Sequence, residues 1–184
     1  MLAIDTSSAR SALALVDGDR VLAEVVKPSG REFDVASEVA ALLPEPAALD
    51  SVLVALGPGS FTGLRQGIAF GVGLAMSLKV PLYGIGTLDL VAARSPDPVV
   101  AVSEAGRGRF YFQAPDGTRG VADADSVPRD WPAAGWLRTA GLELLAEDRL
   151  LSFGEAVVRA REKAKEVGYA TVRPEYMTEF GRVE

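Results

Sequence analysis

The chain has 184 residues, a net charge of −6 and a pI of about 4.8, and it contains neither histidine nor cysteine. Without imidazole or thiol groups it cannot form a Ser-His-Asp triad, a cysteine nucleophile, a histidine general base or a disulfide, and it lacks the usual zinc ligands. The acidic balance argues against a protein that binds nucleic acid alone, because such surfaces are usually strongly basic.

Three short apolar runs open the chain, at residues 1–5, 11–16 and 21–26. The last two runs are separated by Asp17-Gly18-Asp19, and an Asp-Gly pair between two apolar runs is a strong hairpin signal. We therefore predict an antiparallel meander of three strands at the start of the chain.

Helices and strands alternate after this meander. Apolar residues recur with a helical period over residues 31–43, and the continuous apolar run 51–56 indicates a strand buried on both faces. A helix over 61–78, a strand over 81–85 and a helix over 87–93 follow. This order matches RNase H-like and actin-like domains, so we expect an α/β fold with helices on the faces of a mixed sheet.

The sequence Ser95-Pro-Asp-Pro98 predicts a domain boundary, with an N-terminal lobe over residues 1–94 and a shortened C-terminal lobe and tail over 95–184. In the second lobe we expect strands at 99–103, 108–114 and 135–139 and helical segments to about residue 167. Trp131, Trp136 and the aromatic residues 110–112 are expected in its core.

A glycine motif, Gly57-Pro-Gly-Ser-Phe-Thr-Gly63, joins a buried strand to a helix, where phosphate-binding loops occur. It fails the P-loop pattern because Leu64 stands where lysine is required. It also fails the G-x-G-x-x-G dinucleotide pattern, because Thr62 occupies the sixth position. A tight structural turn and a weak anion site both remain open.

Glycines recur every four residues within the following helix, at Gly63, Gly67 and Gly71. Each interior helical glycine costs about 1 kcal/mol relative to alanine, so the stripe predicts close backbone approach to another element. The approaching element is either the domain's own sheet or neighbouring helix, or a helix of another subunit.

The first strand ends in Asp5-Thr6-Ser7, which matches the position where actin-like ATPases place an aspartate near Mg²⁺. The alternative is an Asx or Ser/Thr turn. The second lobe should supply a second phosphate loop, but residues 102–106 lack the usual glycine-rich turn. Nucleotide binding at these three residues is therefore the weaker interpretation.

No membrane segment is predicted, since the longest uncharged run, residues 51–64, is too short for the roughly 20 residues of a membrane helix. The first residues carry no basic region typical of a signal peptide. We expect a soluble cytoplasmic protein.

Several motifs together resemble the TsaB (YeaZ) family. They are Ala3-Ile-Asp-Thr-Ser7, Gly57-Pro-Gly-Ser-Phe-Thr-Gly-Leu-Arg65, Gly84-Ile-Gly-Thr-Leu88, the Arg107–Tyr111 pair and Pro174-Glu-Tyr-Met177. The resemblance implies an actin-like ATPase (ASKHA) fold without its own catalysis. Family members are noncatalytic partners of TsaD, which transfers threonylcarbamoyl to adenosine-37 of tRNA. The resemblance thus implies no cofactor, no metal and only indirect tRNA contact.

The resemblance also implies a partner surface on the first two helices, which bind TsaD and can pair with themselves as a homodimer, with TsaE in the larger complex. Phe33 stands where relatives often carry a histidine. The predicted interface is Arg31, Phe33, Asp34, Gly63, Leu64, Gly67, Ile68, Gly71 and Leu74. Two alternatives remain, an actin-like ATPase that uses Mg-ATP through Asp5, and a regulator that binds nucleotide without hydrolysing it.

Overall fold

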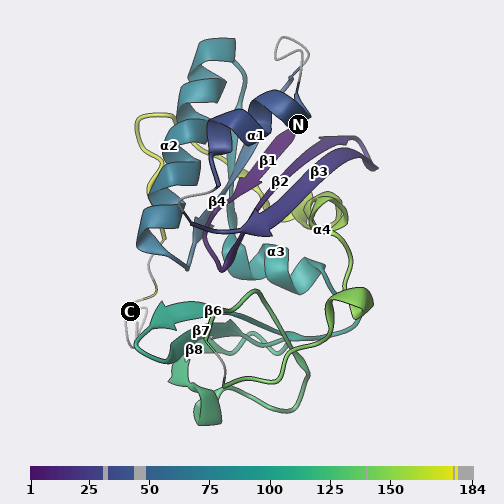
Figure 1. Ribbon diagram of the computed structural model, residues 1–184, viewed down its shortest axis with the longest axis vertical. Helices are drawn as coiled ribbons and strands as arrows, with labels where there is room; N and C mark the ends of the chain where they lie inside the picture. Colours follow the sequence, from purple (N-terminus) through teal and green to yellow (C-terminus); the bar gives the residue numbers. More distant parts are fainter. Residues whose placement is uncertain (31–32, 44–48, 140, 176, 178–184) are drawn as a thin grey trace.

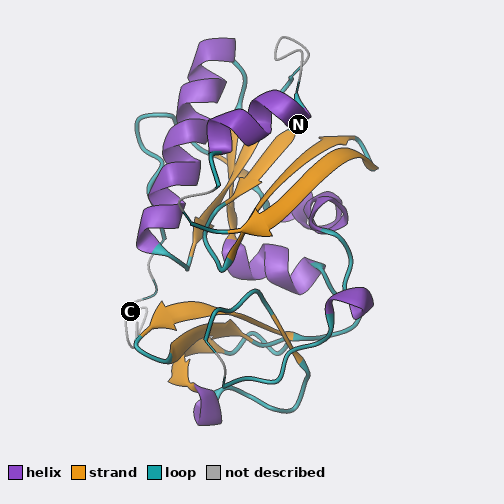
Figure 2. Ribbon diagram, viewed as in Figure 1, coloured by secondary structure: helices purple, strands orange, loops and turns teal. Residues whose placement is uncertain are grey.

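The computed structural model describes residues 1–30, 33–43, 49–139, 141–175 and 177. These residues form two β-sheets with helices around the first sheet (Figures 1 and 2). The first sheet has six strands in the order β10-β5-β4-β1-β2-β3, and the second has four in the order β8-β7-β6-β9. The structure is therefore a mixed α/β fold, as the sequence predicts.

The predicted meander is confirmed as β1 (Leu2–Asp5), β2 (Arg10–Asp17) and β3 (Arg20–Pro28). β1 pairs antiparallel with β2 and parallel with β4 (Val52–Gly57), which pairs parallel with β5 (Leu82–Gly86). All residues of β1 and β4 are buried, as expected for strands covered on both faces.

Two helices cover one face of the first sheet, α1 (Val35–Leu42) and α2 (Phe61–Leu78) (Figure 1). Their inward residues share a core with the inward side chains of β1 and β4. The predicted helix over 31–43 is shorter in the structure because the Asp34 side chain accepts a hydrogen bond from the Ser37 amide and caps a helix that starts at residue 35. Arg31 lies outside the described residues.

The opposite face of the first sheet carries α3 (Thr87–Ala93) and α4 (Phe153–Ala160). α3 also packs against β6, so it lies between the two sheets (Figure 1). Within the described residues, no helix combines the length and the apolar character that crossing a membrane would need.

The second sheet contains β6 (Val100–Gly106), β7 (Arg109–Gln113), β8 (Arg119–Asp123) and the two-residue β9 (Ala133–Ala134). Phe110 and Phe112 lie in its core, as predicted. The predicted strand over 135–139 is wrong, because the pairing with β6 is confined to β9. Gly135 follows β9 directly, and a Cβ at this position would collide with the Val102 carbonyl.

The end of the described chain returns to the first sheet. α4 is followed by a 3-10 turn over Arg161–Lys163 and by β10 (Lys165–Glu166), which pairs with β5. The predicted helix to about residue 167 is therefore too long. The division at residue 94 stays a prediction, but α4 and β10 pack with strands from its N-terminal side.

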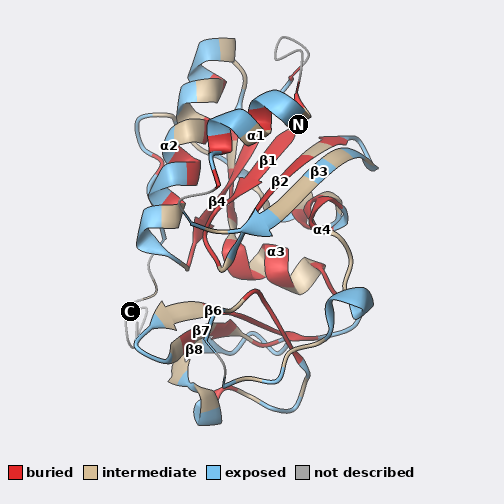
Figure 3. Ribbon diagram, in the orientation of Figure 1, coloured by how far each residue is buried: buried red, intermediate tan, exposed pale blue. Residues whose placement is uncertain are grey.

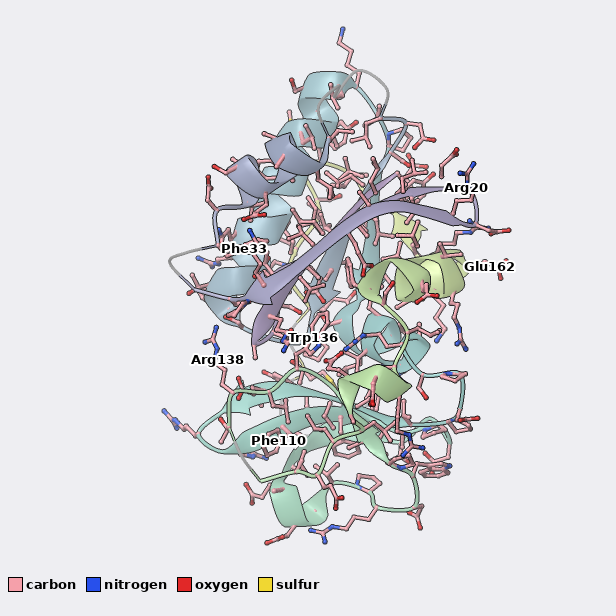
Figure 4. All side chains as sticks on the ribbon, turned by 45° about the vertical axis from the view of Figure 1, so that its right-hand side comes forward. Arg20, Phe33, Phe110, Trp136, Arg138 and Glu162 are labelled. Atoms are coloured by element: carbon pink, nitrogen blue, oxygen red, sulfur yellow. The ribbon has the colours of Figure 1, made fainter. Side chains whose placement is uncertain are left out.

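Trp136 does not lie in the core of the second sheet, where the sequence predicted it. Its ring is buried in the cluster between the first sheet and α4, where it lies 6.4 Å from the Phe153 ring. Figure 4 shows this residue at the junction of the two sheets. The sequence grouped Trp136 with Trp131 and the aromatic residues 110–112 in the second core, but after β9 the chain turns back toward the first sheet.

Candidate functional site

The glycine motif folds directly onto the turn that follows β1. The Ser60 amide donates a 2.6 Å hydrogen bond to the Ser7 carbonyl, and the Thr6 hydroxyl donates one of 2.6 Å to the Gly63 carbonyl. A side chain at Gly59 would collide with the Ser7 backbone. The motif therefore forms a tight structural turn, and the space beside Thr6 and Ser7 is filled by the chain's own backbone.

Ser60 also begins α2. Its side chain accepts a 3.3 Å hydrogen bond from the Gly63 amide, which is the arrangement of a serine N-cap. Gly57, at the start of the motif, has a φ of 116°, a conformation that favours glycine. The same residues thus end β4, turn the chain over the Thr6–Ser7 backbone and start the long helix.

Asp5 is buried beneath this turn. Its Oδ1 accepts hydrogen bonds from the Ser7 amide (2.8 Å) and the Ser7 hydroxyl (2.6 Å), and the Thr87 hydroxyl donates to Ser7 Oγ (3.0 Å). Burial raises the pKa of Asp5, and the Ser7 hydrogen bonds oppose that rise. This is the geometry of an Asx turn, the alternative that the sequence left open.

The three predicted nucleotide-binding residues therefore lie together, but their polar groups bond to one another and to residues at the starts of α2 and α3. Asp5, Thr6 and Ser7 are all buried, so none is presented to solvent. Among the described residues, no group of three or more acidic side chains is placed to hold a metal ion.

The glycine stripe of α2 faces the first sheet. A side chain at Gly67 would collide with the Thr6 hydroxyl, and one at Gly71 with the Val54 side chain. A side chain at Gly63 would collide with the Thr6 carbonyl. The close approach that the stripe predicts is thus made with the domain's own sheet, which was one of the two possibilities the sequence allowed.

Most of the other residues predicted at the interface are also turned inward. Leu64, Ile68 and Phe33 belong to the core between α1, α2 and the sheet, and Leu74 is half-buried. Asp34 is exposed, but its carboxylate caps α1. An arginine at Gly67 or Gly71 would disrupt this core, so such a variant cannot test a contact with another subunit.

The outward sides of α1 and α2 carry a different set of residues. Figure 3 shows the exposed sides of both helices. Phe61 and Met76 are 52% and 53% exposed, unusually high for large apolar side chains. We define the outer face as seven of the exposed residues on these two helices, Ala36, Ala40, Phe61, Arg65, Ala69, Gly73 and Met76.

The outer face is poor in charge. Arg65 is its one charged member, and the guanidinium carbon lies 3.9 Å from the centre of the Phe61 ring. Phe61, Arg65, Ala69, Gly73 and Met76 fall on one side of the helix, because they recur every three or four residues. The sequence already shows that spacing, but the glycine stripe led us to predict the interface on the opposite side of the helix.

A cavity of about 770 Å³ lies between the two sheets. On one side it is lined by Gly57, Pro58 and Gly86, at the carboxyl ends of β4 and β5. On the other side β7 and β8 contribute lining residues, among them Phe112 and Val121. Gly57 and Pro58 belong to the glycine motif, but the sequence did not predict a cavity beside them.

The sequence and fold are similar to those of several known proteins. A family described as "TsaD: tRNA N6-adenosine threonylcarbamoyltransferase" matches residues 36–125. The tRNA threonylcarbamoyladenosine biosynthesis protein TsaB of Bacillus subtilis is 33% identical over 145 residues, 71% of this chain and 63% of that protein. The Escherichia coli protein of the same name is 38% identical over 61 residues, 30% of this chain and 26% of that protein.

The solved structure of YeaZ from Pseudomonas aeruginosa aligns with a TM-score of 0.76 at 23% identity, covering 96% of this chain and 98% of that one. At this identity the likeness establishes the fold alone. The arrangement of two sheets is thus the YeaZ fold, which fits an RNase H-like or actin-like architecture. The chain's matches span less than two thirds of the length of both curated relatives.

Proposed function

Because the chain belongs to the TsaB (YeaZ) family, we propose that it is a noncatalytic subunit in the biosynthesis of N6-threonylcarbamoyladenosine at tRNA position 37. In this role it binds and stabilises the transferase TsaD, whose family matches residues 36–125. Its second sheet would be the shortened second lobe of an actin-like fold. TsaE would join the larger complex, and tRNA would be held mainly by the partner.

The observation that carries the noncatalytic role is the packing of Gly59 on Ser7. An actin-like ATPase needs an open phosphate site beside the aspartate of its first strand. Here the Ser60 amide is bonded to the Ser7 carbonyl, and the Asp5 Oδ1 accepts two hydrogen bonds from Ser7. A phosphate at this position would have to displace the turn that starts α2.

We place the contact with TsaD on the outer face. Exposed apolar anchors surrounded by small residues are suited to helix packing, because small side chains let another helix approach closely. Phe61 and Met76 supply the anchors, and Ala36, Ala40 and Ala69 supply the small positions. The same face would form the homodimer, so TsaD and a second copy would compete for it.

Co-purification with TsaD from the same organism tests this proposal. Ala69→Arg adds a long charged side chain to the outer face, where we expect loss of the complex with the fold preserved. Ala170→Arg is the matched control, because this exposed alanine lies outside the outer face. Failure of the unaltered chain to bind TsaD would overturn the function. An intact complex with Ala69→Arg would overturn only the assigned surface.

A further inference from the structure

The chain passes between the two sheets in several places, and two of these passages are hydrogen-bonded to each other. It leaves the first sheet after α3, at residues 94–99, and comes back at residues 146–152 before α4. The Leu151 amide donates a 2.6 Å hydrogen bond to the Arg94 carbonyl, and Arg94 Nε donates one of 3.2 Å to the Leu151 carbonyl. A hinge motion between the sheets would have to bend both passages together.

The Arg94 side chain binds the returning passage with its whole guanidinium group. Its two terminal nitrogens donate to the two carboxylate oxygens of Glu147, forming a bidentate ion pair, and its guanidinium carbon lies 4.4 Å from the centre of the Trp136 ring. The Trp136 Nε1 donates a 2.6 Å hydrogen bond to Glu147 Oε1. The Arg94 side chain is only 6% exposed.

Trp136 in turn is fixed on the first sheet. Its ring packs against Phe153 of α4, and its carbonyl accepts a 3.3 Å hydrogen bond from the Ala9 amide just before β2. Trp136 follows β9 of the second sheet by only two residues. The cluster thus joins the end of α3, the exit from the second sheet and the helix that covers the first sheet.

We infer that Arg94, Glu147 and Trp136 form a lock that holds the two sheets in one fixed orientation. The Glu147 side chain is 46% exposed, but Arg94 is buried and would be left as a poorly solvated charge without its carboxylate partner, so the cluster favours the bonded arrangement. Packed elements of this kind move between discrete arrangements or not at all. The width of the cavity between the sheets is therefore fixed. A ligand that binds there would not draw the two sheets closer together.

Pulsed electron paramagnetic resonance on the whole chain tests the lock. The chain has no cysteine, so Ser77→Cys on α2 and Asp116→Cys beyond β7 give two spin labels and no others. Both positions are exposed. We expect one narrow distance distribution for the otherwise unaltered chain, and about a twofold wider or a bimodal distribution after Glu147→Gln or Arg94→Met.

Glu147→Gln is the decisive variant, because it keeps the shape of the side chain while removing the charge that Arg94 binds. Arg129→Met is the matched control, since it breaks an exposed ion pair with Asp125 that does not join the two sheets. A broad distribution in the unaltered chain would overturn the lock. So would a distribution equally narrow in Glu147→Gln and in the control, when circular dichroism shows that both are folded.

Discussion

Gly71 of α2 lies so close to Val54 of β4 that a Cβ at this glycine would collide with a methyl group of the valine. The backbone of α2 at Gly67 and Gly71 therefore packs directly against side chains of β1 and β4. This contact explains why the helix tolerates glycines that lower its intrinsic stability. It also fixes which side of α2 is left for another protein.

Gly71→Ala should destabilise the fold, whereas Gly73→Ala should stabilise it. At Gly71 the added methyl meets Val54, and overpacking costs about 1–3 kcal/mol, more than the roughly 1 kcal/mol gained in helix propensity. A Cβ at Gly73 would meet no other part of the protein beyond its own helical turn within 4 Å, so only the gain of about 1 kcal/mol remains. Urea unfolding measures both. Equal changes in the two variants would show that α2 does not rest on the sheet.

The sequence predicted helices and strands correctly in segments that carry one clear pattern. The Asp-Gly turn, the apolar run of β4 and the period of α2 each decide the structure of their own segment. The side of α2 that meets the sheet was not decided by the sequence, because Gly67 pointed equally to a sheet or to another subunit. The packing of α4 and β10 against the first sheet depends on contacts between segments that are far apart in the sequence. No local sequence pattern encodes such contacts.

Phe61→Ala should weaken binding to TsaD more than it weakens the fold. The side chain is about half exposed, so its loss removes less buried area from the chain than the loss of a core phenylalanine would. At the centre of an interface, truncation of a large aromatic anchor costs about 1–2 kcal/mol, roughly tenfold in affinity. Calorimetric titration with TsaD and urea unfolding separate the two effects. Leu22→Ala, which truncates an equally exposed side chain on β3, should leave the affinity unchanged.

We expect the unaltered chain to lose stability as pH rises, because the buried Asp5 then ionises. Asp5→Asn should remove this loss. Because burial raises the pKa of Asp5, the folded chain holds this proton more tightly than the unfolded chain. The folded state is thus favoured below the ordinary aspartate pKa of about 4, and that advantage declines as pH rises through the raised value. Asparagine cannot ionise, and its side-chain oxygen can still accept from Ser7.

The measurement is the difference in unfolding free energy between the two chains at a series of pH values from acid to neutral. Taking the difference cancels groups whose pKa values are lowered in both chains, such as Asp34 and Asp50. We expect the variant to gain stability relative to the unaltered chain with increasing pH. A difference that is constant, or that moves the other way, would show that Asp5 does not titrate as a buried carboxyl.

Mg-ATP should not bind at the Asp5 turn of the isolated chain. The Ser7 carbonyl is already bonded to Ser60, and Gly59 leaves no space beside it, so a phosphate could enter only by unfolding the start of α2. Calorimetry with millimolar Mg-ATP should therefore give the same result for the unaltered chain and for Ser7→Ala. Binding that is lost in Ser7→Ala would revive the nucleotide-binding alternatives. Binding that survives the substitution would point instead to the cavity between the sheets, where Gly86→Trp would be expected to abolish it.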